Sequence, residues 1–89
     1  MNIRIYTIRD AKAECYLPPF TFRTDGEAVR AFDDSVQKPG TALHDHPEDF
    51  FLYRVGCFNQ ESGKVEPLSP VSLGCGSYFV KSGKEDQNG

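Results

Sequence analysis

The sequence has few cysteines, no excess of positive charge and no long apolar run, and each of these features excludes a class of protein. Its three cysteines are Cys15, Cys57 and Cys75, which form no CxxC pair. Any disulfide between two of them leaves the third thiol unpaired. Small secreted scaffolds carry larger, even sets of cysteines. A reducing cytosol, with the cysteines as small apolar fillers, is therefore the better interpretation.

Acidic residues outnumber basic ones by thirteen to ten, so the formal net charge is −3 with both histidines neutral. A basic coat protein or histone-like condenser needs many cations to neutralise phosphates, and this composition excludes one. A local basic patch remains compatible with it. No apolar stretch approaches the ~20 residues that span a bilayer, and the first residues lack the apolar core of a signal peptide. We expect no membrane partner and a protein that stays in the compartment where it is made.

The length of 89 residues allows one small domain. A chain this short buries only ~60–65% of the surface that its unfolded form exposes, which leaves a thin stability margin. We expect a single α+β domain over residues 1–80. Residues 81–89 are polar and terminal, and we expect them to be disordered.

The clearest local pattern predicts a helix over residues 25–37. Thr24 and Glu27 have the spacing of a capping box, in which each side chain binds a free amide at the helix start. Apolar residues then recur at i, i+3 and i+7 along one face, at Val29, Phe32 and Val36. The helix is therefore predicted to pack this stripe against a sheet.

Stretches rich in β-branched and aromatic residues predict strands. They are residues 2–8, 13–17, 50–58 and, after a hairpin connection, 65–68. Residues 41–49 are interpreted as a loop, and residues 69–80 either add an edge strand or pack as an irregular arm. The predicted fold is a small antiparallel sheet of three to five strands with one α-helix packed on one face.

Alternation along the strands predicts which side chains face the helix. We place the odd-numbered positions there, because those of residues 50–58 form a continuous apolar face. The expected core is then Ile3, Ile5, Val29, Phe32, Val36, Phe51, Tyr53 and Val55. The even-numbered positions lie on the opposite, outer face of the sheet.

The outer face is the main candidate site. Arginines beside aromatic rings on an open sheet resemble the surfaces that hold single-stranded nucleic acid by stacking and charge. The candidate nucleic-acid-binding residues are Arg4, Tyr6, Arg54 and Phe58. Alternatively, these rings pack under residues 69–80 or against a second subunit, because an uncovered face would expose an apolar patch. The two interpretations are compatible.

Two histidines beside carboxylates are the other candidate. His44 and His46 would suit zinc or a similar ion, but a solvated acidic loop has the same composition, and the chain has no third histidine. The cysteines lie in apolar contexts, which keep thiols inert. We therefore predict no catalytic residue, no metal site and no cofactor, and we expect a protein that is not an enzyme.

A set of short motifs runs along the chain to about residue 76. They are Ile3-Arg4-Ile5-Tyr6, Arg9-Asp10-x-Lys12-Ala13-Glu14, Tyr16-Leu17-Pro18-Pro19-Phe20, Ala28-x-Arg30-x-Phe32, His46-Pro47-Glu48-Asp49-Phe50, Leu52-Tyr53, Gly56-x-Phe58, Gly63-Lys64 and Ser69-Pro70 to Leu73-Gly74. Together they resemble the small nonstructural protein of gokushoviruses, which are single-stranded DNA phages of the Microviridae. The resemblance implies a bacteriophage protein of the host bacterial cytoplasm that acts in viral single-stranded DNA synthesis or binding. It carries over no active-site residue.

Two functions follow as hypotheses. The first is a nonstructural protein that supports viral DNA replication by binding single-stranded DNA or a replication protein. The second is a homodimeric interaction module whose outer sheet face binds itself or a viral or host protein. The acidic balance argues against strong, purely electrostatic DNA binding.

Overall fold

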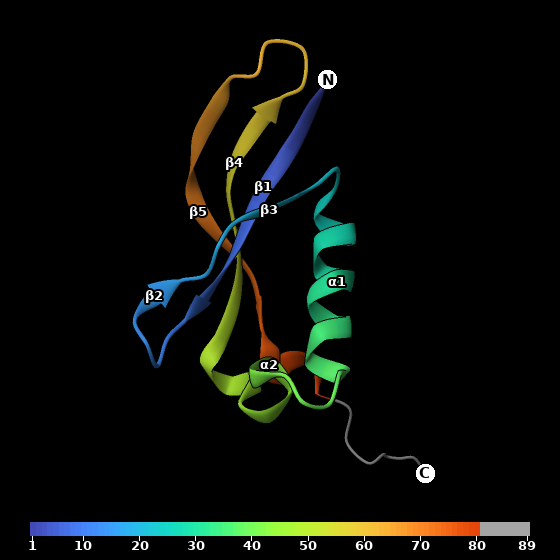
Figure 1. The fold of residues 1–89 in the computed structure, drawn as a ribbon, viewed down its shortest axis with the longest axis vertical. Coiled ribbons are helices and arrows are strands. Elements are labelled where there is room, and N and C mark those ends of the chain that lie inside the picture. Colours follow the sequence, from blue (N-terminus) through green and yellow to red (C-terminus); the bar gives the residue numbers. More distant parts are fainter. Residues whose placement is uncertain (81–89) are drawn as a thin grey trace.

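A sheet of five antiparallel strands forms the body of residues 1–80, the part of the chain that the computed structural model describes (Figure 1). Its two central strands are β1 (Asn2–Asp10) and β4 (Phe50–Asn59). The strand β5 (Val65–Cys75) pairs with the other side of β4. Two short strands, β2 (Cys15–Tyr16) and β3 (Phe20–Phe22), share the remaining edge of β1. The expected α+β class is confirmed, whereas the prediction of a disordered tail concerns residues 81–89, outside the described part.

The helix α1 (Asp25–Gln37) has the predicted bounds and lies across one face of the sheet (Figure 1). Its capping box is present, because the Thr24 hydroxyl accepts from the Glu27 amide while the Glu27 carboxylate accepts from the Thr24 amide. One stripe of the helix is buried against the sheet, at Ala28, Phe32 and Val36. No helix in residues 1–80 is long and apolar enough to cross a membrane.

The predicted loop at residues 41–49 contains the short helix α2 (Ala42–Asp45) and a 3-10 turn, Pro47–Asp49. The Thr41 hydroxyl accepts a hydrogen bond from the His44 amide and so starts α2. The His44 ring in turn lies 2.9 Å from the carbonyl oxygen of Val36, in the last turn of α1. The loop prediction was wrong because this segment caps the end of the long helix.

The strand β5 continues to Cys75 instead of ending at residue 68, despite Pro67 and Pro70. Proline is tolerated here because β5 is an edge strand, where a missing amide need not break a ladder. The 3-10 turn Gly76–Phe79 follows and packs beside α1, where the Gln37 side-chain amide donates to the Phe79 carbonyl at 2.6 Å. Residues 69–80 therefore supply both an edge strand and a packed turn.

The core lies on the other faces of β1 and β4 from those predicted. Its buried apolar residues are Tyr6, Ala28, Phe32, Val36, Phe50 and Leu52. Of the expected core, Phe32 and Val36 are buried and Val29 packs against them. The pattern of apolar residues predicted the wrong face as core, because the outward positions of β4 are more continuously apolar than the inward ones. The inward positions include Tyr6 and Arg54, whose polar groups find partners in α1.

A β-bulge at Val55 divides the side chains of β4 between the two faces. Ile5 pairs with Gly56 and Tyr6 pairs with Arg54, so Val55 has no partner in β1. The extra residue shifts the alternation of β4 relative to β1. Arg54 therefore shares the helix-facing side with Tyr6, whereas Phe58 shares the outer face with its partner Ile3.

Candidate functional site

Three of the four candidate residues meet at one carboxylate, that of Asp25. The Tyr6 hydroxyl donates to Asp25 Oδ1 at 2.7 Å. The Arg54 guanidinium donates to Asp25 Oδ2, and Arg4 Nε lies 3.9 Å from Oδ1. Asp25 is the first residue of α1, where the helix dipole favours a negative charge. The cluster thus joins the middle of the sheet to the start of the helix.

This placement contradicts the expectation of an exposed outer-face set. Tyr6 is fully buried, and its ring stacks on that of Phe20 with the ring centroids 6.2 Å apart. Burial and the hydrogen bond to Asp25 raise the pKa of the Tyr6 phenol above its ordinary value of 10.0, so it stays protonated into the alkaline range. The side chains of Arg54 and Arg4 are 26% and 44% exposed and share one carboxylate. These residues hold helix and sheet together, whereas Phe58 alone of the four lies on the outer face.

The outer face carries a different arginine and aromatic cluster, formed by Arg9, Tyr16 and Tyr53 and called the platform below. Arg9 pairs with Tyr16 across β1 and β2, and its guanidinium carbon lies 5.3 Å from the centre of the Tyr16 ring. The Tyr16 and Tyr53 rings meet edge to face with their centroids 5.9 Å apart. Tyr16 is 49% exposed, so about half of this residue remains open to solvent beside Arg9 and Tyr53.

The strand pairing places the platform on the side of the sheet opposite α1. Tyr53 pairs with Thr7, which alternates with the helix-facing Tyr6, and Phe51 pairs with Arg9 on the same side. The Thr7 hydroxyl donates to the Leu17 carbonyl at 2.6 Å, which fixes the chain just after β2. Beside the platform lies a hollow of about 330 Å³, and its lining residues are Thr7, Tyr16, Leu17, Pro19, Val55 and Pro70.

Sequence reasoning missed Arg9 and Tyr16 because the predicted strand over residues 2–8 ended before Arg9, and residues 13–17 were treated only as a strand. The alternation of side chains along β1 is the signal that could have identified Arg9. Arg9 alternates in step with Ile3 and Ile5, so all three lie on one face of β1. Once Tyr6 is assigned to the core, Arg9 must point outward.

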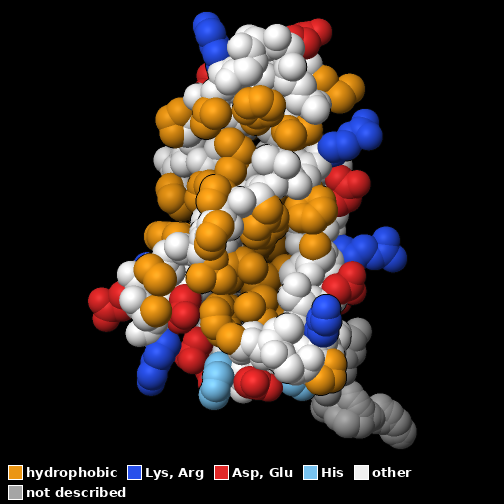
Figure 2. Space-filling model, in the orientation of Figure 1, with side chains coloured by type: hydrophobic (Ala, Val, Ile, Leu, Met, Phe, Trp, Pro, Cys, Tyr) orange, Lys and Arg blue, Asp and Glu red, His pale blue; other side chains and the backbone are white. Residues whose placement is uncertain are grey.

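On the helix side, apolar side chains line a groove between α1 and the edge formed by β3. Figure 2 shows hydrophobic side chains gathered over the middle of the molecule, with charged ones around its margin. The groove has a volume of about 260 Å³ and includes Ile8, Phe20, Phe22, Ala31 and Phe32 among its lining residues. These rings belong to the core or pack against it.

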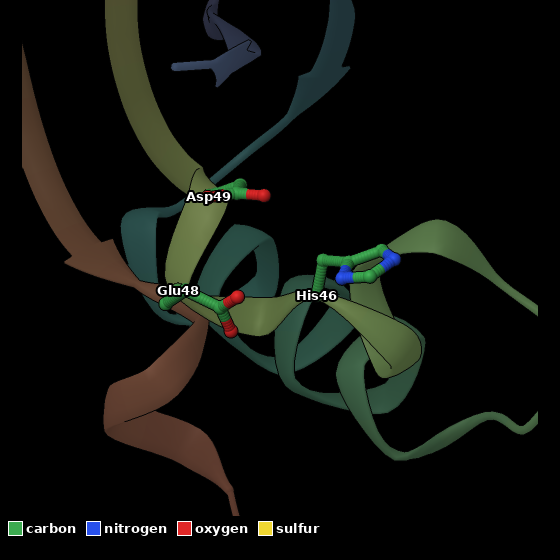
Figure 3. Close-up of side chains that lie close together, drawn as sticks. All are labelled: His46, Glu48 and Asp49. Carbon is green, nitrogen blue, oxygen red and sulfur yellow. The ribbon is translucent and has the colours of Figure 1, made fainter. Parts of the chain in front are cut away.

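The two histidines do not form the pair considered from the sequence. His44 is bonded to the end of α1, and the group in residues 1–80 that could hold a metal ion is His46, Glu48 and Asp49. Their ligand atoms lie within 4.8 Å of one another, and the side chains extend in the same general direction from the turn (Figure 3). His46 and Glu48 are exposed, and Asp49 is half-buried.

The cysteines are free thiols in different surroundings. Cys15 is exposed, contrary to its interpretation as an apolar filler, while Cys57 and Cys75 are half-buried. The Cys75 sulfur lies 3.7 Å from the carbonyl oxygens of Pro47 and Glu48 and accepts from the Ser77 hydroxyl. Its described hydrogen-bond partners thus include no histidine that could act as a base.

Comparison with known proteins places the chain among phage proteins. Protein ORF5 of Chlamydia phage 1, a gokushovirus, is 29% identical over 89 aligned positions, which cover 92% of this chain and 93% of that protein. No solved structure matches the chain. The sequence profile described as "Phage ORF5 protein" matches residues 3–79, nearly the whole described fold. The resemblance to the gokushovirus protein is thereby confirmed, and the chain belongs to the Phage ORF5 protein family.

Proposed function

We propose that this phage protein binds single-stranded DNA through the platform, in support of viral single-stranded DNA synthesis. The observation that carries the proposal is a guanidinium placed over one aromatic ring, which in turn meets a second ring, on the sheet face opposite α1. No covalent chemistry is involved. The protein acts by holding DNA, in the cytoplasm of the bacterial host.

The chemistry of the platform fits an unpaired base. Every base has a π-face, and stacking on an aromatic side chain contributes ~1–3 kcal/mol per base with little dependence on sequence. The half-exposed Tyr16 ring offers that surface, and Tyr53 supports it from the side. Arg9 adds a cation for the adjacent phosphate, and its planar group can itself stack on a base.

The surrounding charges predict weak binding in which stacking dominates. The last residue of β1 is Asp10, the turn after it carries Glu14 as well as Lys12, and the whole chain has a net charge of −3. If Arg9 neutralises one phosphate, log K falls with log salt with a slope of about −0.7. Raising the salt from about 50 to 200 mM then weakens binding only about threefold.

Family membership supports the choice of ligand. The resemblance to the gokushovirus protein implies a role in single-stranded DNA synthesis, and a phage with such a genome must handle unpaired strands. A viral replication protein is the alternative partner for the same face. A platform that served only as a protein contact would show no affinity for an isolated oligonucleotide.

A fluorescence anisotropy titration with a labelled oligothymidine tests the proposal. Tyr16→Ala is expected to weaken binding about 5- to 100-fold, because the stacking surface is lost, and Arg9→Gln is expected to abolish the salt dependence. Tyr78→Ala is the matched control, because Tyr78 is 84% exposed and lies beside Phe79 in the turn after β5. No binding by the unaltered protein, or equal losses in Tyr16→Ala and Tyr78→Ala, would contradict the proposal.

A further inference from the structure

The sheet extends beyond the helix that covers it. Figure 1 shows the β4–β5 hairpin and the start of β1 continuing past the first turn of α1. We call this part the arm and define it as residues 2–5, 56–59 and 65–67. Its strands are fully paired, with Asn2–Ile5 against Gly56–Asn59 and these against Val65–Pro67.

The two faces of the arm differ sharply in chemistry. On the side of α1, one row across the strands is Arg4, Cys57 and Glu66, and Asn2 pairs with Asn59. On the outer side, one row is Ile3, Phe58 and Val65 and the next is Ile5, Gly56 and Pro67. A Cβ placed on Gly56 would lie 3.5 Å from the Ile5 side chain, which shows that Ile5 lies over the glycine. The outer face is thus an uncharged apolar surface across three strands.

This surface is exposed along β5, whereas Ile3, Ile5 and Phe58 are half-buried. Val65 is 64% exposed, and all of β5 from Val65 to Ser72 is exposed. The radius of gyration is 14.4 Å, compared with about 12 Å for a compact chain of this length. A strand pattern with one polar and one apolar face is typical of a sheet whose apolar face is packed on something.

We infer that a second copy of this chain packs its own arm against the outer face of the arm, as a two-fold homodimer. Two copies that each carry a net charge of −3 repel one another. This repulsion is smallest where the two copies meet through surfaces without charged residues. The two apolar rows of the arm contain no charged residue. A two-fold contact places the same surface of both copies together, so this surface must be complementary to itself. An apolar sheet face meets this requirement, because two such faces can pack ~10 Å apart.

The arm supplies less area than a standard interface. A standard interface buries ~800 Å² on each partner, which is about one seventh of the 5574 Å² surface of the chain. The arm is one end of a molecule that extends 49 × 27 × 21 Å, so a contact confined to the arm is smaller than this standard, and we expect a weak dimer that forms in the micromolar range. The platform lies toward the other end of the same face, so a two-fold axis through the arms leaves both platforms free.

Sedimentation velocity between about 1 and 100 μM tests the inference without DNA, so its outcome is independent of that of the proposed function. The unaltered protein is expected to shift from monomer to dimer over this range. Val65→Asp is expected to weaken the dimer at least tenfold, because the two-fold contact would bury a carboxylate from each copy. Circular dichroism checks that the variant is folded.

Val71→Asp is the matched control. It makes the same change on the same strand, but Val71 pairs with the helix-facing Arg54 and is 41% exposed. This variant is expected to dimerise like the unaltered protein. A monomer at every concentration, or equal weakening by Val65→Asp and Val71→Asp, would overturn the inference.

Discussion

The Tyr6 hydroxyl and the Asp25 carboxylate, 19 residues apart in sequence, share a 2.7 Å hydrogen bond between the central strand and the first residue of α1. Arg54 from the second central strand binds the other oxygen of the same carboxylate. One acidic residue at the helix start therefore fixes how α1 is placed on β1 and β4. It also pairs with Arg4 and Arg54, the two cations that the sequence analysis offered to DNA, and in the proposed function Arg9 on the other face takes that role.

Replacing Asp25 with asparagine is expected to lower the free energy of unfolding by about 1–2 kcal/mol. The change removes the charge that Arg54 and Arg4 share while keeping the size of the side chain, and hydrogen bonds to charged groups are worth more than neutral ones. Urea denaturation measures the loss. Asp34→Asn on the exposed side of α1 is the control and should change stability by less than about 0.5 kcal/mol. Equal stability of the two variants would remove Asp25 from its structural role.

Stability is expected to fall at alkaline pH because of Tyr6. Burial and the Asp25 hydrogen bond raise the pKa of its phenol above the ordinary 10.0. The unfolded chain then releases this proton near pH 10 while the folded chain keeps it, so the stabilisation is complete below pH 10 and declines above it. One such group contributes a slope of up to about 1.4 kcal/mol per pH unit.

Urea denaturation between pH 8 and pH 11 checks this decline. Tyr6→Phe should show a shallower fall than the unaltered protein, because it has no proton to lose at that position. Tyr78→Phe, at an exposed site, should keep the full slope. If Tyr6→Phe declined as steeply as Tyr78→Phe, the buried phenol would not be the cause.

Two glycine-to-alanine changes are expected to have opposite signs. A Cβ on Gly76 would lie 2.5 Å from the Pro47 carbonyl oxygen, so Gly76→Ala forces backbone apart and should cost about 1–3 kcal/mol. A Cβ on Gly26 would meet nothing closer than 3.9 Å, so Gly26→Ala should stabilise α1 by about 0.5–1 kcal/mol. Thermal unfolding of both variants decides the matter, and a tolerated alanine at position 76 would contradict the close packing of the two turns.

The His44 ring is expected to stabilise the end of α1. Its removal in His44→Ala leaves the Val36 carbonyl without this partner and should cost about 0.5–1.5 kcal/mol. His46→Ala is the matched control, because His46 is exposed and its ring makes no such bond in residues 1–80. Amide exchange in the last turn of α1 should speed up only in His44→Ala. Faster exchange in both variants would argue against a specific cap.

Local signals predicted the helix and its cap correctly, because the Thr24–Glu27 box acts within one turn of chain. The strands were also located, but their faces were reversed. Hydrophobicity alone favoured Phe51 and Tyr53 as core, and only the tertiary partner Asp25 makes Tyr6 and Arg54 acceptable on the inner side. Alternation cannot supply that information, since a shift of one residue exchanges every side chain between the faces.

The candidate site was mispredicted for a second, independent reason. The bulge at Val55 separates Arg54 from Phe58, which simple alternation had placed on one face. No glycine or proline at residues 54–55 marks the bulge, although Gly56 follows it. The folded sheet does carry a cluster of one arginine and two aromatic residues. Arg9, Tyr16 and Tyr53 come from β1, β2 and β4, however, and meet only in the folded protein.

Photocrosslinking of the protein to a 5-iododeoxyuridine oligonucleotide, followed by peptide mass spectrometry, tests the central claim most directly. The method reports which aromatic side chains touch an unpaired base. The platform predicts adducts on Tyr16 or Tyr53, and their loss in Tyr16→Ala, with none on Tyr78. Adducts confined to Tyr78, or unchanged labelling in Tyr16→Ala, would contradict the assignment of the outer face as the DNA-binding surface.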